Sequence, residues 1–193
     1  MSIKGVYAAS MSIFNQDLSL DIDSTIKHAE NVIKNGVGVA VLGSTSQAQL
    51  IGLYEKKVFI EKLAASKIKN SPILIGTGLN SVKDNINLIR HSLKYGFDKF
   101  LVMNPAYYTN TDPGVYSFYS NIVEQVPECK IVLYNFSKLA AGYAFSPEIV
   151  KKLINEFGTE AFIGMKDSTG NAWQNLKINN FSMLVGNEIN LLK

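Results

Sequence analysis

The segment Phe162-Ile163-Gly164-Met165-Lys166-Asp167-Ser168-Thr169-Gly170 is a short apolar run that ends in a polar turn. We interpret the run as a buried strand with Lys166 at its C-terminal tip, because a strand interior rarely tolerates a lysine. An amine in a mostly apolar pocket loses part of its solvation. Burial then favours the neutral form, which can attack a carbonyl and form a Schiff base. The alternative is that Lys166 has reached the strand end and points into solvent.

The rest of the chain repeats this pattern, because short β-branched runs alternate with longer amphipathic stretches. We predict strands over Gly5–Ser10, Gly38–Leu42, Ile73–Gly76, Phe100–Met103, Ile131–Tyr134, Phe162–Met165 and Ser182–Val185. We predict helices over Ile22–Asn35, Tyr54–Lys69, Val82–Tyr95, Val115–Gln125 and Pro147–Glu156, with a further short helix possible in the linker Asn171–Asn180. Strands that are apolar throughout are typical of a parallel sheet with both faces buried, and the alternation predicts an α/β fold.

Local signals mark the ends of several helices. Asp23-Ser24 precedes the apolar rhythm of the first helix, and Gly36 supplies its stop. Ser81 is a candidate N-cap for the third helix. Ser146-Pro147 predicts the start of the last helix, with proline at its first position.

Polar side chains follow nearly every predicted strand, namely Ser44 and Thr45, Thr77, Asn104, Asn135, Lys166 and Glu188. Such groups at the C-terminal ends of so many strands favour a ring that converges on one axis, the TIM (β/α)8 barrel. A doubly wound sheet fits the same alternation, but it concentrates its ligand groups at one switch point. The chain also lacks G-x-G-x-x-G after the first strand, since Gly76-Thr77-Gly78 offers half of that pattern and follows the third.

The predicted elements are too few for a closed barrel. We find seven strands in 193 residues, whereas a barrel needs eight strands and typically takes about 250 residues. The sequence ends at Leu191-Leu192-Lys193, inside what resembles the opening of a further helix. We therefore expect one domain over residues 1–193 that is an incomplete barrel, without the eighth βα unit and the C-terminal helical region.

The composition is that of an ordinary globular protein, with 47% hydrophobic and 18% charged residues. The net charge of +3 is weak and the Lys and Arg residues are scattered, so we expect no nucleic-acid or membrane partner. Cys129 is the one cysteine, and no apolar run approaches the ~20 residues that span a bilayer. The N-terminal sequence does not have the form of a signal peptide, so we expect a cytoplasmic protein. His28 and His91 stand isolated on predicted helices, and we expect no metal site.

Motifs at the strand ends resemble those of the dihydrodipicolinate synthase / N-acetylneuraminate lyase family of class I, pyruvate-dependent aldolases. The matching segments are Gly43-Ser44-Thr45, Ile75-Gly76-Thr77-Gly78-Leu79-Asn80, Pro105-Ala106-Tyr107-Tyr108, Leu133-Tyr134-Asn135, Gly164-Met165-Lys166-Asp167-Ser168 and Val185-Gly186-Asn187-Glu188. Each motif is weak or moderate alone. Their common order along the whole chain makes the resemblance strong.

The resemblance implies a role for each of these segments. Lys166 would form an imine with pyruvate, and Tyr134 would shuttle the proton as general acid and base. Ser44 and Thr45 would hold the pyruvate carboxylate. Either Tyr107 or Tyr108, often supplied by a neighbouring subunit in the family, would complete a hydroxyl relay through Thr45. The remaining substrate contacts would come from Gly186, Lys138 and Glu188. The lysine itself supplies the electron sink, so no cofactor is expected. The partners would be pyruvate, an aldehyde and further copies of the chain in a homo-oligomer, a dimer or tetramer.

The chain departs from the family pattern in two loops. Ser46-Gln47 stands where the family usually has Gly-Glu, and a glycine there often supports an unusual backbone angle, so we expect Ser46 to shift the loop. The segment Phe136–Gly142 lacks both the usual proline and the arginine that clamps aspartate semialdehyde in dihydrodipicolinate synthases. Lys138 replaces that planar fork only partly. Ile189 stands where sialic acid lyases carry a second acidic residue, so a 2-keto-3-deoxy sugar acid is the preferred substrate class.

Other interpretations stay open from the sequence. Taken alone, Tyr134-Asn135 fits a packing tyrosine with a turn asparagine, Tyr107-Tyr108 fits an aromatic surface contact, and Ser44-Thr45-Ser46 fits a helix-capping loop. The runner-up function is dihydrodipicolinate synthase itself, which condenses pyruvate with aspartate semialdehyde. The third is a non-catalytic barrel relic that binds pyruvate without turnover or does not bind it.

Overall fold

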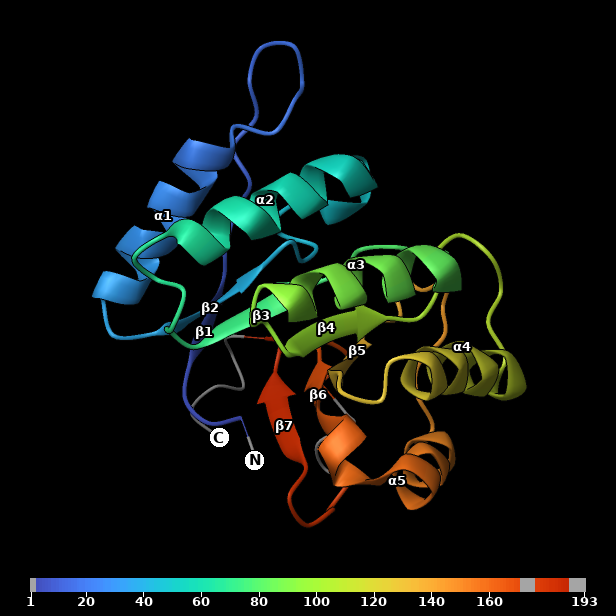
Figure 1. Cartoon of the computed structure of the whole chain (residues 1–193). Helices are drawn as coiled ribbons and strands as arrows, with labels where there is room; N and C mark the ends of the chain where they lie inside the picture. The colour runs from blue at the N-terminus through green and yellow to red at the C-terminus, as the bar shows by residue number, and fades with distance from the viewer. Residues whose placement is uncertain (1–2, 171–175, 188–193) are drawn as a thin grey trace. The chain divides into compact units, whose positions relative to one another are not determined.

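The computed structural model describes residues 3–170 and 176–187 of the chain. The described residues form two compact units, each built of parallel strands and helices (Figure 1). The N-terminal unit comprises residues 5–79 and 83–101, and the C-terminal unit comprises residues 3–4, 80–82 and those from 102 onward.

The N-terminal unit holds the strands β1 (Tyr7–Ala9), β2 (Gly38–Val41) and β3 (Ile73–Gly76), and β4 (Lys99–Met103) begins in it. All three pairings are parallel and follow the chain order. Every residue of β2 and β3 is buried, as expected for strands covered on both faces. The helices are α1 (Ile22–Lys34), α2 (Leu53–Ala65) and α3 (Val82–Lys94), with a 3₁₀ turn η1 (Ala48–Leu50) after β2.

The C-terminal unit contains β5 (Lys130–Asn135), β6 (Phe162–Asp167) and β7 (Ser182–Val185). These strands also pair in parallel and in chain order. The helices α4 (Asp112–Gln125) and α5 (Pro147–Ala161) lie side by side (Figure 1). Tyr119 of α4 is fully buried against the rings of Phe145 and Phe162, and its hydroxyl donates to the carbonyl of Val102.

The strand order decides between the two α/β architectures. A doubly wound sheet reverses its strand order at the switch point, where ligands bind. Neither β1-β2-β3-β4 nor β5-β6-β7 contains such a reversal. The order is that of a (β/α) barrel, as the polar strand ends predict.

Most predicted helix boundaries are confirmed, and the differences have local causes. α4 begins at Asp112 and not at Val115, because Thr111 caps it by accepting a hydrogen bond from the N–H of Gly114. α2 ends at Ala65 rather than Lys69, since the backbone turns out of the helix at Ser66. Gly158 has a φ of +79°, which interrupts α5 close to the predicted end at Glu156. The described end of the linker, residues 176–180, is not helical, and residues 171–175 lie outside the description.

The caps agree with the predicted chemistry but shift in position. The predicted helix start at Ile22 is confirmed, but the N-cap of α1 is Asp21, whose carboxylate accepts from the N–H of Ser24, and not the Asp23-Ser24 pair. Ser146 caps α5 and Pro147 follows it, as predicted. Among the helices that the structure describes, none is both long and apolar enough to cross a bilayer.

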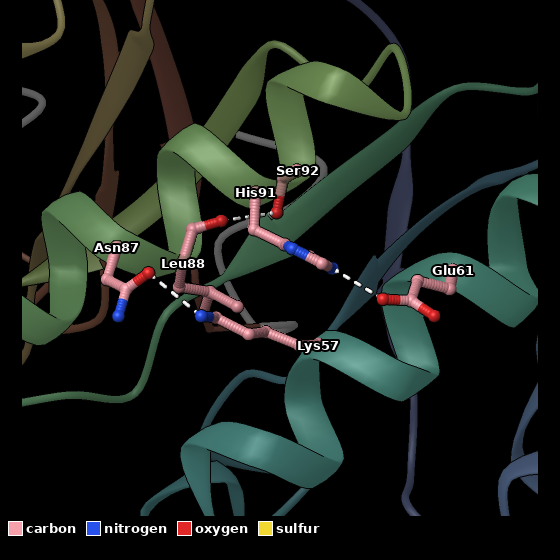
Figure 2. Close-up of polar contacts among 6 residues, drawn as sticks. All are labelled: Lys57, Glu61, Asn87, Leu88, His91 and Ser92. Atoms are coloured by element: carbon pink, nitrogen blue, oxygen red, sulfur yellow. Dashed lines mark hydrogen bonds and ion pairs between the residues drawn. The ribbon is translucent and has the colours of Figure 1, made fainter.

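Polar contacts join α2 and α3 on their outer side (Figure 2). Nζ of Lys57 donates to Oδ1 of Asn87 at 2.8 Å, and Nε2 of His91 lies 3.2 Å from Oε1 of Glu61. The ring of His91 also packs against that of Tyr95, with the centroids 5.1 Å apart and the planes tilted by 48°. Within the described residues, no three His, Cys, Asp or Glu side chains gather as metal ligands.

Candidate active site

Lys166 and Tyr134 face each other across neighbouring strands. They are paired in the β5–β6 ladder, and Nζ of Lys166 lies 4.3 Å from the centroid of the Tyr134 ring. Tyr134 is buried and Lys166 is half-buried. The lysine therefore neither points freely into solvent nor sits in a wholly apolar pocket. It lies on an aromatic face next to a phenol.

A register shift creates this pairing. Ile131 pairs with Phe162, but the next residue, Val132, pairs with Gly164, so Ile163 is an extra residue in β6. Without that bulge, the register would place Met165 opposite Tyr134. A one-residue slip moves every following side chain to the other face of a strand. The bulge at Ile163 therefore sets Lys166 against Tyr134.

The next residues of β5 and β6 form a buried polar network. Oδ1 of Asp167 accepts from Nδ2 of Asn135 at 3.0 Å, and from the N–H and hydroxyl of Thr169 at 3.0 and 2.6 Å. Asn135 and Asp167 are each about 1% exposed. Oδ1 of Asn135 accepts from the N–H of Phe145, and the backbone carbonyl of Asn135 accepts from the N–H of Ser168. The network fixes the turns that follow both strands of the Lys166–Tyr134 pair.

The sequence motifs did not reveal that these residues form a network that supports the site. The Asp-x-Thr spacing of Asp167 and Thr169 is a turn signature, in which the carboxylate accepts from a backbone N–H two residues on. Its partner Asn135 comes from another strand, and only the folded register brings the two together.

A cavity of about 530 Å³ opens at the C-terminal ends of these strands. Its lining residues are Asn135, Phe136, Ser137, Lys138, Gly142, Ala144, Phe145, Pro147, Ser168, Thr169, Leu176 and Asn187. Hydroxyl, amide and ammonium groups alternate with apolar side chains in this wall. Lys138, predicted as a substrate ligand, is one of the lining residues and is exposed. Such a mixed lining suits a polar ligand of modest size.

Gly186 brings the turn after β7 close to the turn after β6. Its N–H donates to the carbonyl of Asp167 at 2.7 Å, and a Cβ in its place would lie 2.2 Å from Oγ of Ser168. The missing side chain is therefore required by the protein's own packing. Glu188, the other predicted substrate ligand of this turn, lies outside the described residues.

In the N-terminal unit, Ser44 and Thr45 follow β2 and are exposed. Ser46 is buried, and its hydroxyl donates to the carbonyl of Ser10 after β1 at 2.5 Å. The left-handed backbone angle in this loop falls on Gln47, with φ of +53°, and not on Ser46. Ser46 instead ties the Ser44-Thr45 loop to the end of β1.

Lys56 of α2 is a buried cation that the motifs did not reveal. It is fully buried, and Nζ donates to the carbonyls of Thr77 and Gly78 at 2.7 and 3.3 Å. Burial lowers the pKa of Lys56 to about 8, although the negative charge of Asp84 acts in the opposite direction. Lys56 thereby holds the loop after β3. Lysines on helices are normally exposed, so the sequence gives no signal for this role.

Tyr107 and Tyr108 lie in the C-terminal unit and are strongly exposed, at 85% and 73%. Their rings meet edge to face at 5.1 Å. Tyr107 has a φ of +79°, a strained value for an aromatic residue. The Asn80 side chain supports this segment by accepting from the N–H of Ala106 at 2.9 Å. This exposure agrees with the alternative interpretation of Tyr107-Tyr108 as an aromatic surface contact.

The sequence profile of the Dihydrodipicolinate synthetase family matches residues 2–192. The chain belongs to this family. A 4-hydroxy-tetrahydrodipicolinate synthase of Bartonella bacilliformis is 31% identical over 88% of the chain. The putative 2-dehydro-3-deoxy-D-gluconate aldolase YagE of Escherichia coli K12 is 30% identical over 85% of it. The resemblance drawn from the strand-end motifs is therefore confirmed.

Solved structures of family members share the fold. The 4-hydroxy-tetrahydrodipicolinate synthase of Methylacidiphilum fumariolicum SolV superposes with a TM-score of 0.85 at 26% identity, over 96% of the chain and 62% of its own. YagE in complex with pyruvate superposes with a TM-score of 0.75 at 30% identity, over 84% of the chain and 54% of its own. The barrel fold class predicted from the sequence is confirmed. The chain spans 56% of the Bartonella relative and 53% of YagE.

Proposed function

We propose that this member of the family is a class I aldolase that forms a Schiff base between Lys166 and pyruvate and makes or cleaves a carbon–carbon bond. The observation that carries the proposal is the Lys166–Tyr134 pair, with the amine 4.3 Å from the centroid of a phenol ring. A lysine amine is the nucleophile of imine chemistry, and a phenol beside it can serve as general acid and base. Both residues lie at the C-terminal ends of their strands, where barrel enzymes carry their catalytic groups.

The other predicted residues have supporting parts in this proposal. Ser44 and Thr45 bind the pyruvate carboxylate through hydroxyl and backbone N–H groups, and Tyr107 takes part in the proton transfer. Tyr108 and Gly186 complete the binding site, with Lys138 and Glu188 toward the aldehyde end. The imine itself draws electrons from the reacting carbon, so the reaction requires no metal or organic cofactor.

We propose that the substrate is a 2-keto-3-deoxy sugar acid or a related aldol. Support comes from the cavity wall, where Ser137, Ser168 and Thr169 provide hydroxyls and Asn187 an amide. These groups suit a polyhydroxylated chain. Lys138 adds a positive charge for a carboxylate, so condensation of pyruvate with aspartate semialdehyde is the second candidate function.

The substrate assay uses 2-dehydro-3-deoxy-D-gluconate, whose retro-aldol cleavage gives pyruvate and glyceraldehyde. A parallel reaction offers pyruvate with aspartate semialdehyde, and Lys166→Ala is the control for both. We expect the cleavage to have the higher kcat/KM. Faster condensation with the semialdehyde would assign the dihydrodipicolinate synthase reaction instead. Imine formation without turnover of either substrate would identify a pyruvate-binding protein and contradict the aldolase proposal.

We also propose that the chain works as part of one barrel domain, in the cytoplasm, in a homo-oligomer that is a dimer or tetramer. The exposed pair Tyr107-Tyr108 supports an interface between copies, since aromatic residues are enriched at the centres of such contacts. Light scattering after gel filtration tests the assembly, and Tyr107→Ala with Tyr108→Ala should shift it toward the monomer. A wild-type monomer at micromolar concentration would contradict it.

A further inference from the structure

The loop Phe136–Ser146 forms one wall of the 530 Å³ cavity. Between β5 and α5, it contributes Phe136, Ser137, Lys138, Gly142, Ala144 and Phe145 to the lining. The loop is held internally by backbone turns, with the N–H of Gly142 donating to the carbonyl of Ser137 at 2.9 Å and that of Tyr143 to Ala140 at 3.0 Å. These turns lie within the loop. The position of the loop relative to the strands depends on contacts made by residues outside it.

Asp112, the first residue of α4, contacts the loop at two points. Its two carboxylate oxygens accept separate hydrogen bonds, from the hydroxyl of Tyr143 at 2.7 Å and from the hydroxyl of Ser146 at 2.8 Å. Hydrogen bonds to an ionised carboxylate are roughly twice as strong as neutral ones. Tyr143 lies between Gly142 and Ala144, which both line the cavity. The carboxylate thus holds the loop close to its cavity-facing residues.

The phenol of Tyr143 is a permanent donor in this contact. Burial and the hydrogen bond to Asp112 raise the pKa of Tyr143 well above its ordinary value. The phenol is therefore protonated at every pH at which an aldolase would be assayed. Asp112 itself does not line the cavity.

Asn110, two residues before Asp112, reaches the same loop. Its Nδ2 donates to the carbonyl of Pro105 at 2.8 Å and to that of Tyr108 at 3.1 Å, and lies 3.4 Å from the carbonyl of Ala140. The segment after β4 therefore holds both the loop with the exposed Tyr107-Tyr108 pair and the loop with Lys138. Near the C-terminal end of the loop, the N–H of Phe145 donates to Oδ1 of Asn135, the last residue of β5, at 3.2 Å.

We propose that Asp112 is a positioning residue that sets the loop Phe136–Ser146, and with it Lys138, for the aldehyde partner of the reaction. The inference rests on the proposed aldolase function and deepens it, because it assigns the cavity wall to recognition of the second substrate. Tyr134 lies on β5 and Lys166 on β6, and their ladder pairing does not involve Asp112. Loss of Asp112 should therefore weaken aldehyde binding and spare the imine.

The variants are Asp112→Ala and the milder Tyr143→Phe, which removes one hydroxyl and leaves Ser146 bonded to Asp112. Tyr116→Phe is the matched control. It removes a phenol–carboxylate hydrogen bond to Glu156 that also joins α4 and α5, but at a site away from the loop. Tyr143→Phe keeps the test decisive if Asp112→Ala fails to fold.

Two measurements separate this inference from the function it rests on. Borohydride trapping with pyruvate reports the imine, and kinetics with pyruvate and D-glyceraldehyde report the aldehyde KM. We expect an unchanged imine, and an aldehyde KM raised roughly 10-fold or more in Asp112→Ala and less in Tyr143→Phe, with a smaller change in kcat. An aldehyde KM within twofold of the wild type in folded Asp112→Ala and in Tyr143→Phe would overturn the inference, as would an equal loss of imine and aldehyde binding.

A third readout does not need catalysis. Lys138 is exposed, so trypsin can cut after it, and the initial rate of that cut reports how tightly the loop is held. We expect faster cleavage at Lys138 in Asp112→Ala and Tyr143→Phe, and wild-type rates in Tyr116→Phe. Unchanged cleavage in both variants would show that the loop does not depend on Asp112. If the wild type formed no imine, the aldolase proposal would fail, while this readout would still judge the tether.

Discussion

The contact between Lys166 and Tyr134 has two opposite consequences for the amine. The face of an aromatic ring attracts a cationic amine that lies over it. Attack on a carbonyl requires the neutral amine, so the proton must leave before the imine forms. Within this pair, the hydroxyl of Tyr134 is the group that can move this proton. The ring and the hydroxyl of Tyr134 thus act at different stages.

Tyr134→Phe separates these two contributions, because it keeps the ring and removes the hydroxyl. We expect kcat to fall by roughly 10²–10⁴, the range for a lost general acid and base. Circular dichroism should show an unchanged fold, since the replaced side chain differs by one oxygen. An unchanged kcat would remove Tyr134 from the proton-transfer steps.

Lys56 gives the protein a stability that depends on pH. Its pKa of about 8 lies below the ordinary value of 10.5, so between these values the unfolded chain binds more protons than the folded one. The contribution of Lys56 to the free energy of unfolding therefore rises with pH through this window. The cause is that the neutral amine keeps its bonds to the carbonyls of Thr77 and Gly78 without the cost of burying a charge.

Urea unfolding of wild type and Lys56→Met at pH 7, 8, 9 and 9.5 measures this dependence. The destabilisation caused by the substitution should grow with pH, by on the order of 1–2 kcal/mol over the series. Lys57→Met on the same helix is the control, because Lys57 is only half-buried and donates to the side chain of Asn87 (Figure 2). A Lys56→Met effect that shrinks as pH rises would contradict the assigned direction.

At the scale of elements, the approach of β3 to β2 depends on Gly76. A Cβ at this position would lie 2.2 Å from the carbonyl oxygen of Leu42, whereas a Cβ at Gly43 would meet nothing within 4 Å. We expect Gly76→Ala to lower the free energy of unfolding by about 1–3 kcal/mol, the usual cost of an overpacked site. Gly43→Ala should stay within about 0.5 kcal/mol of wild type. Equal effects of the two substitutions would contradict the close approach.

Cys129, at the entrance to β5, is predicted to be inert in the folded protein. It is fully buried, and burial raises the pKa of its thiol to about 12. We expect almost no reaction with a disulfide reagent such as DTNB at pH 8, and one equivalent per chain after unfolding in urea. Labelling at the rate of a free thiol in the native protein would show that this end of β5 opens.

Strands and helices were predictable because their signal is local. Apolar runs such as Ile73–Gly76 and Ser182–Val185 have the same bounds in the sequence prediction and in the structure. Lys166 was conspicuous in the sequence as a lysine at the end of a buried strand, whereas Tyr134 was singled out by the family resemblance, and the roles of both residues stay predictions. The bulge at Ile163 was not predictable, since the register belongs to two strands at once.

The supporting residues were hidden for a related reason. Lys56 has the sequence context of any helical lysine, and its burial follows from the packing of α2 against the loop after β3. Asp112 stands three residues before the helix predicted over Val115–Gln125, and its partners Tyr143 and Ser146 are chosen by the fold. Residues that hold a site in place carry less sequence signal than residues that perform its chemistry.

At the scale of the whole molecule, both units place polar groups after consecutive strands. Ser44-Thr45 and Thr77 follow β2 and β3 in the N-terminal unit, and the pair Lys166–Tyr134 lies at the ends of β5 and β6 in the C-terminal unit. This arrangement agrees with the barrel fold of the family, in which active sites lie at the C-terminal ends of the strands. The proposed aldolase function therefore depends most on whether Lys166 reacts with pyruvate.

The direct test is to incubate the protein with pyruvate, reduce it with borohydride and map the product by mass spectrometry. Reduction of an imine leaves a stable secondary amine. We therefore expect one pyruvate-derived adduct per chain, located on Lys166. Lys166→Ala should carry none under the same conditions. A folded wild-type protein without an adduct, or with the adduct on another lysine, would contradict the assignment of Lys166 as the imine-forming residue.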